Sequence, residues 1–336
     1  MRASNNFPEK NKYSFNKLVK DVYVYAILLA VVIVLSLIKG DIFQRGNFLY
    51  PANITNIMRM SVPILIISSA FTFIMISGHI DLSVGSLLSL TSVFYSILAI
   101  NGFGFLPSLL LTLVLGVALG GINGWLVMKM RITPVIATLI TMNVYQGIAR
   151  YLVPAGEPAI QGSAMPDWVG DLARKEIVAG LSWAFIVTII IVIALVIVKN
   201  KTILGKYTCA IGGNRTAAEL SGINAVKTVW ILYIILGVFS SFAGVVRASY
   251  LSIGQPYTGM GVETEAIIAV LLGGTVFTGG EGSVVKSVIG ALIIVCLTLG
   301  LKTVIPEYWQ SLAKGVVLVL AVALNHVLTK DRLAAQ

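Results

Sequence analysis

Charged residues are scarce in this chain of 336 residues: Asp, Glu, Lys and Arg make up 11%, whereas 57% of the residues are hydrophobic. Soluble domains carry about a quarter charged residues, so the composition excludes an ordinary soluble protein and predicts an integral membrane protein. The formal net charge of +10 could suggest nucleic acid. The basic residues stand at the ends of apolar segments, however, as the positive-inside rule places them, so no nucleic acid partner is expected.

Cysteine, histidine and nucleotide-binding motifs are also scarce or missing. Cys209 lies in a basic loop and Cys296 in an apolar segment, so the two predict neither a disulfide nor a metal site. Two histidines are too few to suggest a catalytic cluster in a membrane-embedded enzyme. No GxxxxGK[ST] phosphate-binding loop occurs, so we expect no ATP hydrolysis, no catalytic residues and no cofactor in this chain.

Apolar segments of about 20 residues, the length that crosses a bilayer as a helix, are the main feature of what is present. The predicted fold class is an all-α polytopic membrane protein with about ten transmembrane helices. The expected spans are 21–38, 59–77, 82–101, 107–128, 133–151, 182–198, 228–250, 263–279, 284–301 and 309–327. Gly-rich or polar turns interrupt 59–101 and 263–301, so broken or re-entrant helices are expected there.

The distribution of Lys and Arg predicts the orientation of the chain. With the N-terminus inside, roughly twice as many basic residues lie at the cytoplasmic ends of the spans as at the outer ends. The expected organisation is a cytoplasmic N-terminal tail (1–20), a single transmembrane domain (21–327) and a cytoplasmic C-terminal tail (328–336). Both termini are then cytoplasmic, and the first span is an uncleaved helix.

The cytoplasmic stretch 199–227 separates two of these spans and is rich in basic residues. Asn214 is a candidate N-cap and Gly222 a stop signal, which predicts about two turns of helix between them. A helix this short is marginal in water and needs a docking surface. That surface is either the protein's own spans or a groove in a cytoplasmic partner, for which the small Ala217 and Ala218 are suited.

Two groups of polar residues interrupt the apolar segments, and each has a structural and a functional interpretation. Asp81 and Ser83 can cap a helix start, or line a solute path at a broken helix; His79 and Asp81 could form a proton relay, although we predict a structural role for His79. Arg247, Glu263 and Glu265 can pair with one another or gate a solute. Nearby lie residues that suit a sugar or an interfacial aromatic belt: Tyr250, Gln255 and Tyr257.

Three stretches resemble the permease subunits of bacterial ATP-binding-cassette (ABC) sugar importers, in the ribose, galactose and xylose branch. They are GHIDLSVGS at 78–86, the run from AIGGN to SGI at 210–223, and ETEAIIA at 263–269 with the glycines that follow. His79 departs from the family, which usually has Gly there. The stretch PEYWQ at 306–310 is most similar to galactose-type members.

The resemblance implies a type II-like ABC importer permease of the bacterial cytoplasmic (inner) membrane. It implies a dimer with a second permease copy or a paralogue, a cytoplasmic ATPase subunit that binds ATP and Mg²⁺, and an external solute-binding protein. The solute would be a sugar or a related small polar molecule. The alternative is an ion-coupled secondary transporter, which would need several acidic residues at mid-membrane.

The resemblance also assigns candidate site residues. The stretch 199–227 becomes the coupling loop to the ATPase subunit, with the coupling residues Gly212, Gly213, Asn214, Arg215, Ala217, Ala218, Glu219 and Gly222. The candidate residues of the solute pathway or its gate are Asp81, Ser83, Arg247, Tyr250, Glu263 and Glu265. No metal site is expected.

Overall fold

The computed structural model describes residues 9–38, 48–160, 165–178 and 180–302, with six single positions between 306 and 319. These residues form twelve α-helices, a 3₁₀ turn and a two-stranded antiparallel sheet. The elements are α1 (Glu9–Ile38), α2 (Pro51–Ile76), α3 (Val84–Ile100), α4 (Phe105–Met128), α5 (Pro134–Tyr151), η2 (Asp167–Gly170), α6 (Asp171–Arg174), β1 (Glu176–Val178), β2 (Leu181–Ser182), α7 (Trp183–Lys201), α8 (Ile203–Gly213), α9 (Arg215–Leu220), α10 (Ala225–Leu251), α11 (Val262–Leu272) and α12 (Val284–Lys302).

The helical membrane fold predicted from the sequence is confirmed. Each predicted span up to residue 301 falls on a helix, and 309–327 lies outside the continuously described residues. Five helices are long and apolar enough to cross a membrane by themselves: α2, α4, α7, α10 and α12. The protein is therefore polytopic, while the count of ten spans stays a prediction.

Helices α2 and α10 form the centre of the bundle. Helix α10 packs against α2, α3 and α4, and α2 also contacts α7, α11 and α12. Both central helices are largely buried, whereas α4 and α7 expose most of their apolar length. Exposed apolar side chains on the outer helices are what a lipid environment requires, because lipid tails replace water around them.

Glycines bring α4 and α10 into close contact. A Cβ atom at Gly120 would collide with the Tyr233 carbonyl oxygen and lie 3.0 Å from the Gly237 Cα atom, and one at Gly237 would collide with the Gly116 carbonyl oxygen. Small residues let membrane helices approach until their backbones touch, and the gain in van der Waals contact holds them together. This crossing fixes α4 against the centre of the bundle.

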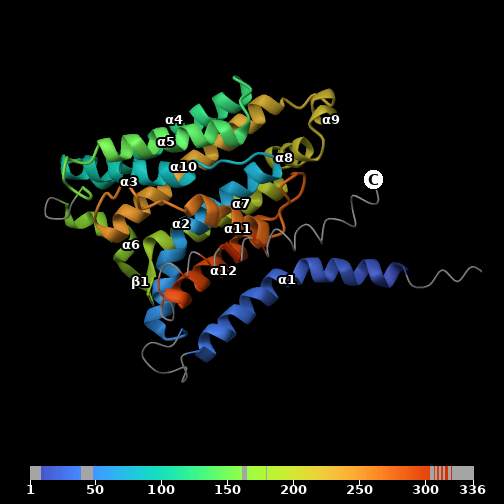
Figure 1. Cartoon of the computed structure of the whole chain (residues 1–336), viewed down its shortest axis with the longest axis horizontal. Coiled ribbons are helices and arrows are strands. Elements are labelled where there is room, and N and C mark those ends of the chain that lie inside the picture. The colour runs from blue at the N-terminus through green and yellow to red at the C-terminus, as the bar shows by residue number, and fades with distance from the viewer. Residues whose placement is uncertain are drawn as a thin grey trace, which may run out of the picture.

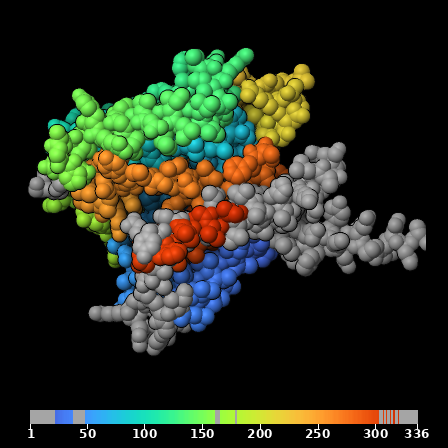
Figure 2. Space-filling model, viewed as in Figure 1, coloured from blue at the N-terminus to red at the C-terminus, as the bar shows by residue number. Residues whose placement is uncertain are grey.

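The bundle has two distinct ends (Figure 1). One carries the loop 77–83, helices α8 and α9, and the loop 273–283, which meet where Gly212 lies against Ile76 and Gly280. We call it the inner end, since it is the end predicted to face the cytoplasm, and α8–α9 project from it (Figure 2). The opposite, outer end carries α6 and the β1–β2 hairpin, which an ion pair between Arg59 and Glu176 (2.5 Å) joins to α2.

Helix α11 is much shorter than the predicted span 263–279. Its 11 residues rise about 16 Å, against roughly 30 Å of bilayer core. The apolar run continues past Leu272, but Gly273 and Gly274 end the helix, and a glycine-rich loop follows. The segment 252–261, which precedes α11, is also non-helical and runs along α3. Gly254 lies beside Ser96 of α3, and the Gly259 N–H donates to the hydroxyl of Ser89, further along the same helix (2.9 Å). The break expected within 263–301 corresponds to the glycine-rich loop between α11 and α12. The non-helical segment 252–261 lies outside the predicted ranges and was not expected.

Substitution of neighbouring glycines tests the α4–α10 crossing. Gly120→Ala should lower the thermal stability of the detergent-solubilised protein by several degrees, because the new methyl group separates the two helices, and overpacking costs about 1–3 kcal/mol. Gly121→Ala is the matched control, since its Cβ meets only an Ile234 side-chain atom at 3.8 Å. Equal melting temperatures for the two variants would contradict the assignment.

Single-cysteine labelling tests the orientation. With Cys209 and Cys296 replaced by Ser, Asp167→Cys at the outer end should react with an impermeant maleimide added to intact cells. Thr216→Cys, on α9, should react only after the membrane is opened, because α9 is predicted to be cytoplasmic. Labelling of both positions in intact cells would refute the two-ended topology.

Candidate functional site

The predicted cytoplasmic helix exists as α9, preceded by the longer α8. The Asn214 side chain accepts a hydrogen bond from the Ala217 N–H (3.0 Å), which confirms Asn214 as the N-cap. At the other end Gly222 has φ +85°, and the Ile223 N–H donates to the Ala218 carbonyl (3.1 Å). This is the glycine-terminated helix end that the sequence predicted.

The eight predicted coupling residues divide into two groups. Gly212 and Ala218 face their own chain: a Cβ on Gly212 would collide with the Ile76 carbonyl oxygen, and Ala218 is only 5% exposed. The others are exposed at the surface of the inner end: Gly213, Asn214, Arg215, Ala217, Glu219 and Gly222. The small size of Ala218 is therefore required by intramolecular packing, and our interpretation that it is small to fit a partner's groove is corrected.

Leu220 was missed by the sequence analysis. This side chain is 85% exposed at the C-terminal end of α9, next to the exposed ion pair between Arg215 and Glu219 (2.9 Å). An apolar side chain in water is costly at about 25 cal/mol per Å² of its surface. The available signal was a lone leucine among polar residues on a helix too short to form a core, and such a residue is suited to contact a partner.

A compact backbone junction connects α8 to the central helices. The Gly280 N–H donates to the Ile76 carbonyl at the end of α2 (2.8 Å), and Gly212 of α8 lies against both residues. No side chain separates these backbones, so a displacement of α8 reaches α2 and the loop before α12 directly. This contact gives the exposed inner surface a mechanical connection to the membrane helices.

Asp81 and Ser83 belong to a buried hydrogen-bond network behind this junction. One Asp81 carboxylate oxygen accepts from the Ser83 backbone N–H (2.8 Å) and hydroxyl (2.7 Å), and the other accepts from the Asn123 amide (3.0 Å). The Tyr145 hydroxyl donates to the Asn123 oxygen (3.1 Å). All four residues are buried, and together they join the loop before α3 to α4 and α5. They line none of the cavities described below.

His79 lies in the same loop but faces a cavity at the inner end. Its Nδ1 atom donates to the Ser77 carbonyl (2.8 Å), and its ring meets Tyr233 edge to face. Burial lowers the pKa of His79 from its usual 6.5; the Ser77 hydrogen bond opposes this shift, and the nearby Arg215 charge adds to it. A neutral ring fits the structural role predicted for His79, and no hydrogen bond joins it to Asp81 in the described structure.

A cavity of about 270 Å³, separate from the one that His79 faces, lies between α2, α10, α11 and α12. Arg247 and Glu265 both line it, with Thr258 and Lys302. The Arg247 guanidinium donates to the Thr258 hydroxyl (3.0 Å), so the non-helical segment 252–261 contributes directly to the wall. Thr258 and Lys302 were not predicted, because a single Thr in a loop and a Lys at a helix end give no distinctive signal.

The remaining candidates of the solute pathway lie outside this cavity. Glu263 is in the first turn of α11, where its carboxylate accepts from the Gly261 N–H (3.2 Å) and lies against Gly85 of α3. Tyr250 packs on an apolar cluster that includes Val62 and Val246. The structure thus brings Arg247 and Glu265 to one cavity and places the other four candidates elsewhere.

The structure is a helical membrane bundle with a cavity, a broken helix and an exposed helix pair, and these features also occur in membrane transport subunits. The comparisons with known proteins identify the family. Residues 53–322 match the family model described as branched-chain amino acid transport system / permease component, and the chain belongs to this family. No solved structure matches the chain.

Sugar permeases are among the curated relatives of the chain. The chain is 35% identical to the ribose import permease of Escherichia coli strain K12, with 91% of this chain and 93% of the relative covered. It is 33% identical to that organism's D-allose transport system permease (98% of each chain) and 30% identical to its galactose/methyl galactoside import permease (94% and 96%). The resemblance to the sugar branch is confirmed. The lower identity to the galactose permease gives no support for the galactose-type members suggested by 306–310.

Asn123 tests the buried network. Asn123→Leu should lower the free energy of unfolding by about 1–3 kcal/mol, because Asp81 and Tyr145 each lose a partner in a buried site. Tyr145→Phe, which removes one hydroxyl, should cost about 1 kcal/mol or less. Reversible unfolding in mixed micelles measures both variants, and an Asn123→Leu protein as stable as the wild type would show that the network contributes nothing to stability.

Proposed function

We propose that this chain is the membrane-spanning subunit of an ABC importer that carries a sugar inward. A separate ATPase subunit drives it, and an external solute-binding protein delivers the solute. The proposal depends on one observation at the inner end: Leu220 of α9 is exposed, and α8, the helix before α9, packs against α2. The relatives named above are permeases for ribose, D-allose and galactose, which supports a monosaccharide as the solute.

A polar face on the exposed side of the bundle supports a dimeric permease. The face joins α5 to the segment before α11: the Gln146 amide donates to the Pro256 carbonyl (2.5 Å), and the Arg150 guanidinium lies 4.8 Å from the centre of the Tyr257 ring. Asn143, Arg150 and Tyr257 are exposed there. Asn143 lies near the middle of α5, and a polar side chain at membrane depth faces a protein or a water-filled path, not lipid, so a second permease copy facing this surface would enclose a polar path.

The broken helix supports the same solute path. Non-helical backbone at membrane depth is tolerated where protein buries it or where it lines an aqueous cavity, and helices interrupted near mid-membrane often form solute sites in transporters. The segment 252–261 meets both conditions. Gly254 and Gly259 are buried by the protein, and Thr258 lines the cavity with Arg247 and Glu265. Hydroxyl, guanidinium and carboxylate groups are suitable partners for the hydroxyl groups of a sugar.

An ion-coupled secondary transporter is the alternative function. It is favoured by one observation, the fully enclosed Asp81 carboxylate, because buried acids in membrane proteins often carry protons. Against it, both Asp81 oxygens are held by Ser83 and Asn123, which is the arrangement of a structural cap. Proteoliposomes separate the two functions: the alternative requires sugar uptake by the permease alone along an ion gradient, and the proposal requires ATP, the ATPase subunit and the solute-binding protein.

Leu220 provides the sharpest test of coupling. Leu220→Glu should reduce ATPase co-purification and ATP-driven uptake at least tenfold, since a charge replaces the apolar contact, while membrane insertion and thermal stability stay unchanged because the residue is 85% exposed. Leu220→Met preserves the apolar surface and is the matched control. Ala218→Arg is unsuitable, because Ala218 is buried in its own chain. Full association and uptake in Leu220→Glu would exclude α9 as the coupling element.

A further inference from the structure

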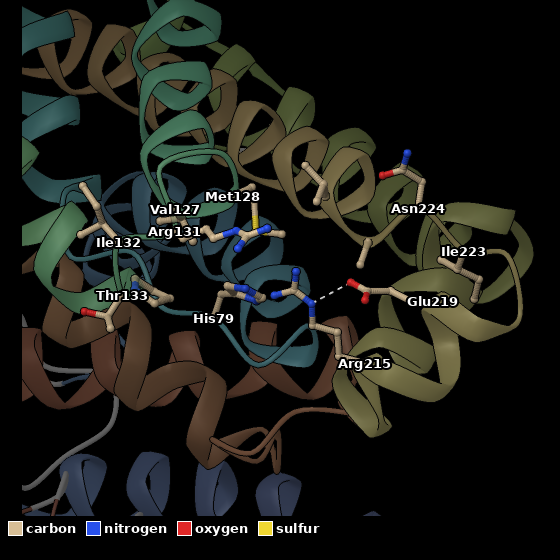
Figure 3. A pocket seen from close by; sticks show the side chains of 13 residues that line it. His79, Val127, Met128, Arg131, Ile132, Thr133, Arg215, Glu219, Ile223 and Asn224 are labelled. Atoms are coloured by element: carbon tan, nitrogen blue, oxygen red, sulfur yellow. Dashed lines mark hydrogen bonds and ion pairs between the residues drawn. The ribbon is translucent and has the colours of Figure 1, made fainter.

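The cavity that His79 faces at the inner end has a wall that the coupling-loop prediction did not include. This cavity of about 620 Å³ is open to the surface and lies between α9, the start of α10 and the α4–α5 connection. Figure 3 shows the guanidinium groups of Arg131 and Arg215 reaching into the same space beside the His79 ring. Arg131 belongs to the α4–α5 connection, so residues more than 80 positions apart form one cationic site.

The charges that face the cavity are unbalanced. Arg215 is paired with Glu219, whereas Arg131 has no ion-pair partner in the described parts of the chain. The acidic side chain that lines this cavity is Glu219, so one positive charge remains uncompensated. Two guanidinium groups directed into a partly enclosed space favour an anionic group between them, because a carboxylate accepts strong, charge-assisted hydrogen bonds from guanidinium donors.

The backbone holds Arg131 in this position. Its φ is +57°, the left-handed conformation with which many helices end, and Arg131 takes it shortly after α4 ends. The loop is also tied back to α4 on both sides, since the Met130 N–H donates to the Trp125 carbonyl (3.1 Å) and the Ile132 N–H to the Leu126 carbonyl (3.2 Å). A fixed loop loses little entropy when the Arg131 side chain binds a partner.

We propose that this cavity is a socket for an acidic side chain of the ATPase subunit, held between Arg131 and Arg215. The inference rests on the proposed function and deepens it. Apolar side chains form much of the remaining wall, among them Val127, Met128, Ile132 and Ile223. With Leu220 exposed on the same short helix, the site matches a protein segment in which a carboxylate is flanked by apolar residues. A free inorganic anion would use the arginines but gain nothing from the apolar wall.

The experiment measures binding of the purified ATPase subunit to the full-length permease in lipid nanodiscs, at low and high salt. Arg131→Gln should weaken binding on the order of tenfold or more and flatten its salt dependence, because a charge-assisted contact is lost. Arg131→Lys retains the charge and should restore most of the affinity. Lys129→Gln is the matched control: Lys129 lies two residues away, is exposed, and does not line this cavity.

Three further outcomes distinguish failure of the proposed function, failure of the socket and binding of a free anion. If the wild-type permease binds no ABC ATPase, the proposed function fails. If the wild type binds and Arg131→Gln binds equally well, only the socket is refuted. Titration of the nanodisc-embedded permease alone with inorganic phosphate tests the competing ligand: binding that depends on Arg131 but does not compete with the ATPase would identify a site for a free anion and overturn the proposal.

Discussion

Every backbone group that leaves a helix inside a membrane must find its hydrogen-bond partner within the protein, and this constraint shapes the structure. The segment before α11 is non-helical, and neighbours hold it: the Gly259 N–H donates to the Ser89 hydroxyl, and the Pro256 carbonyl accepts from the Gln146 amide. At the inner end, the Gly280 N–H donates in the same way to the Ile76 carbonyl. The breaks are therefore possible only because specific helices lie beside them. The same breaks create the cavities and the polar face on which a transport function depends.

The inner junction shows how such a structure can transmit motion. Packed helices and backbones in direct contact move as units, because a close-packed interior does not absorb a displacement. Helix α8 touches the end of α2 through Gly212, and α2 extends through the centre of the bundle to the cavity, which Met60 and Pro63 help to line. In the proposed importer, a force applied at α9 would arrive at the solute cavity through one continuous helix.

Local rules predicted a large part of this arrangement. The Asn214 cap and the Gly222 stop follow from the residues themselves, and the apolar segments gave the helices. What the sequence could not give depends on contacts between distant residues. The partner of Asp81 is Asn123, 42 positions away and surrounded by apolar sequence; Ala218 is small because of its own chain; and α11 ends in the middle of an apolar run. The importance of Arg131 becomes visible only when two connections meet at one cavity.

The inner junction also has an evolutionary consequence. A Cβ atom on Gly279 would lie 2.8 Å from the Gly78 nitrogen, and one on Gly280 would lie 3.2 Å from the Gly213 Cα atom. Both residues also have φ values above +80°, a conformation that residues other than glycine rarely adopt. A larger residue at Gly212, Gly279 or Gly280 would therefore displace a neighbouring segment, so the loops 77–83 and 273–283 and the end of α8 cannot diverge independently at these positions. Three segments far apart in the gene are under one joint selection, and we expect them to change together across related permeases or to remain fixed.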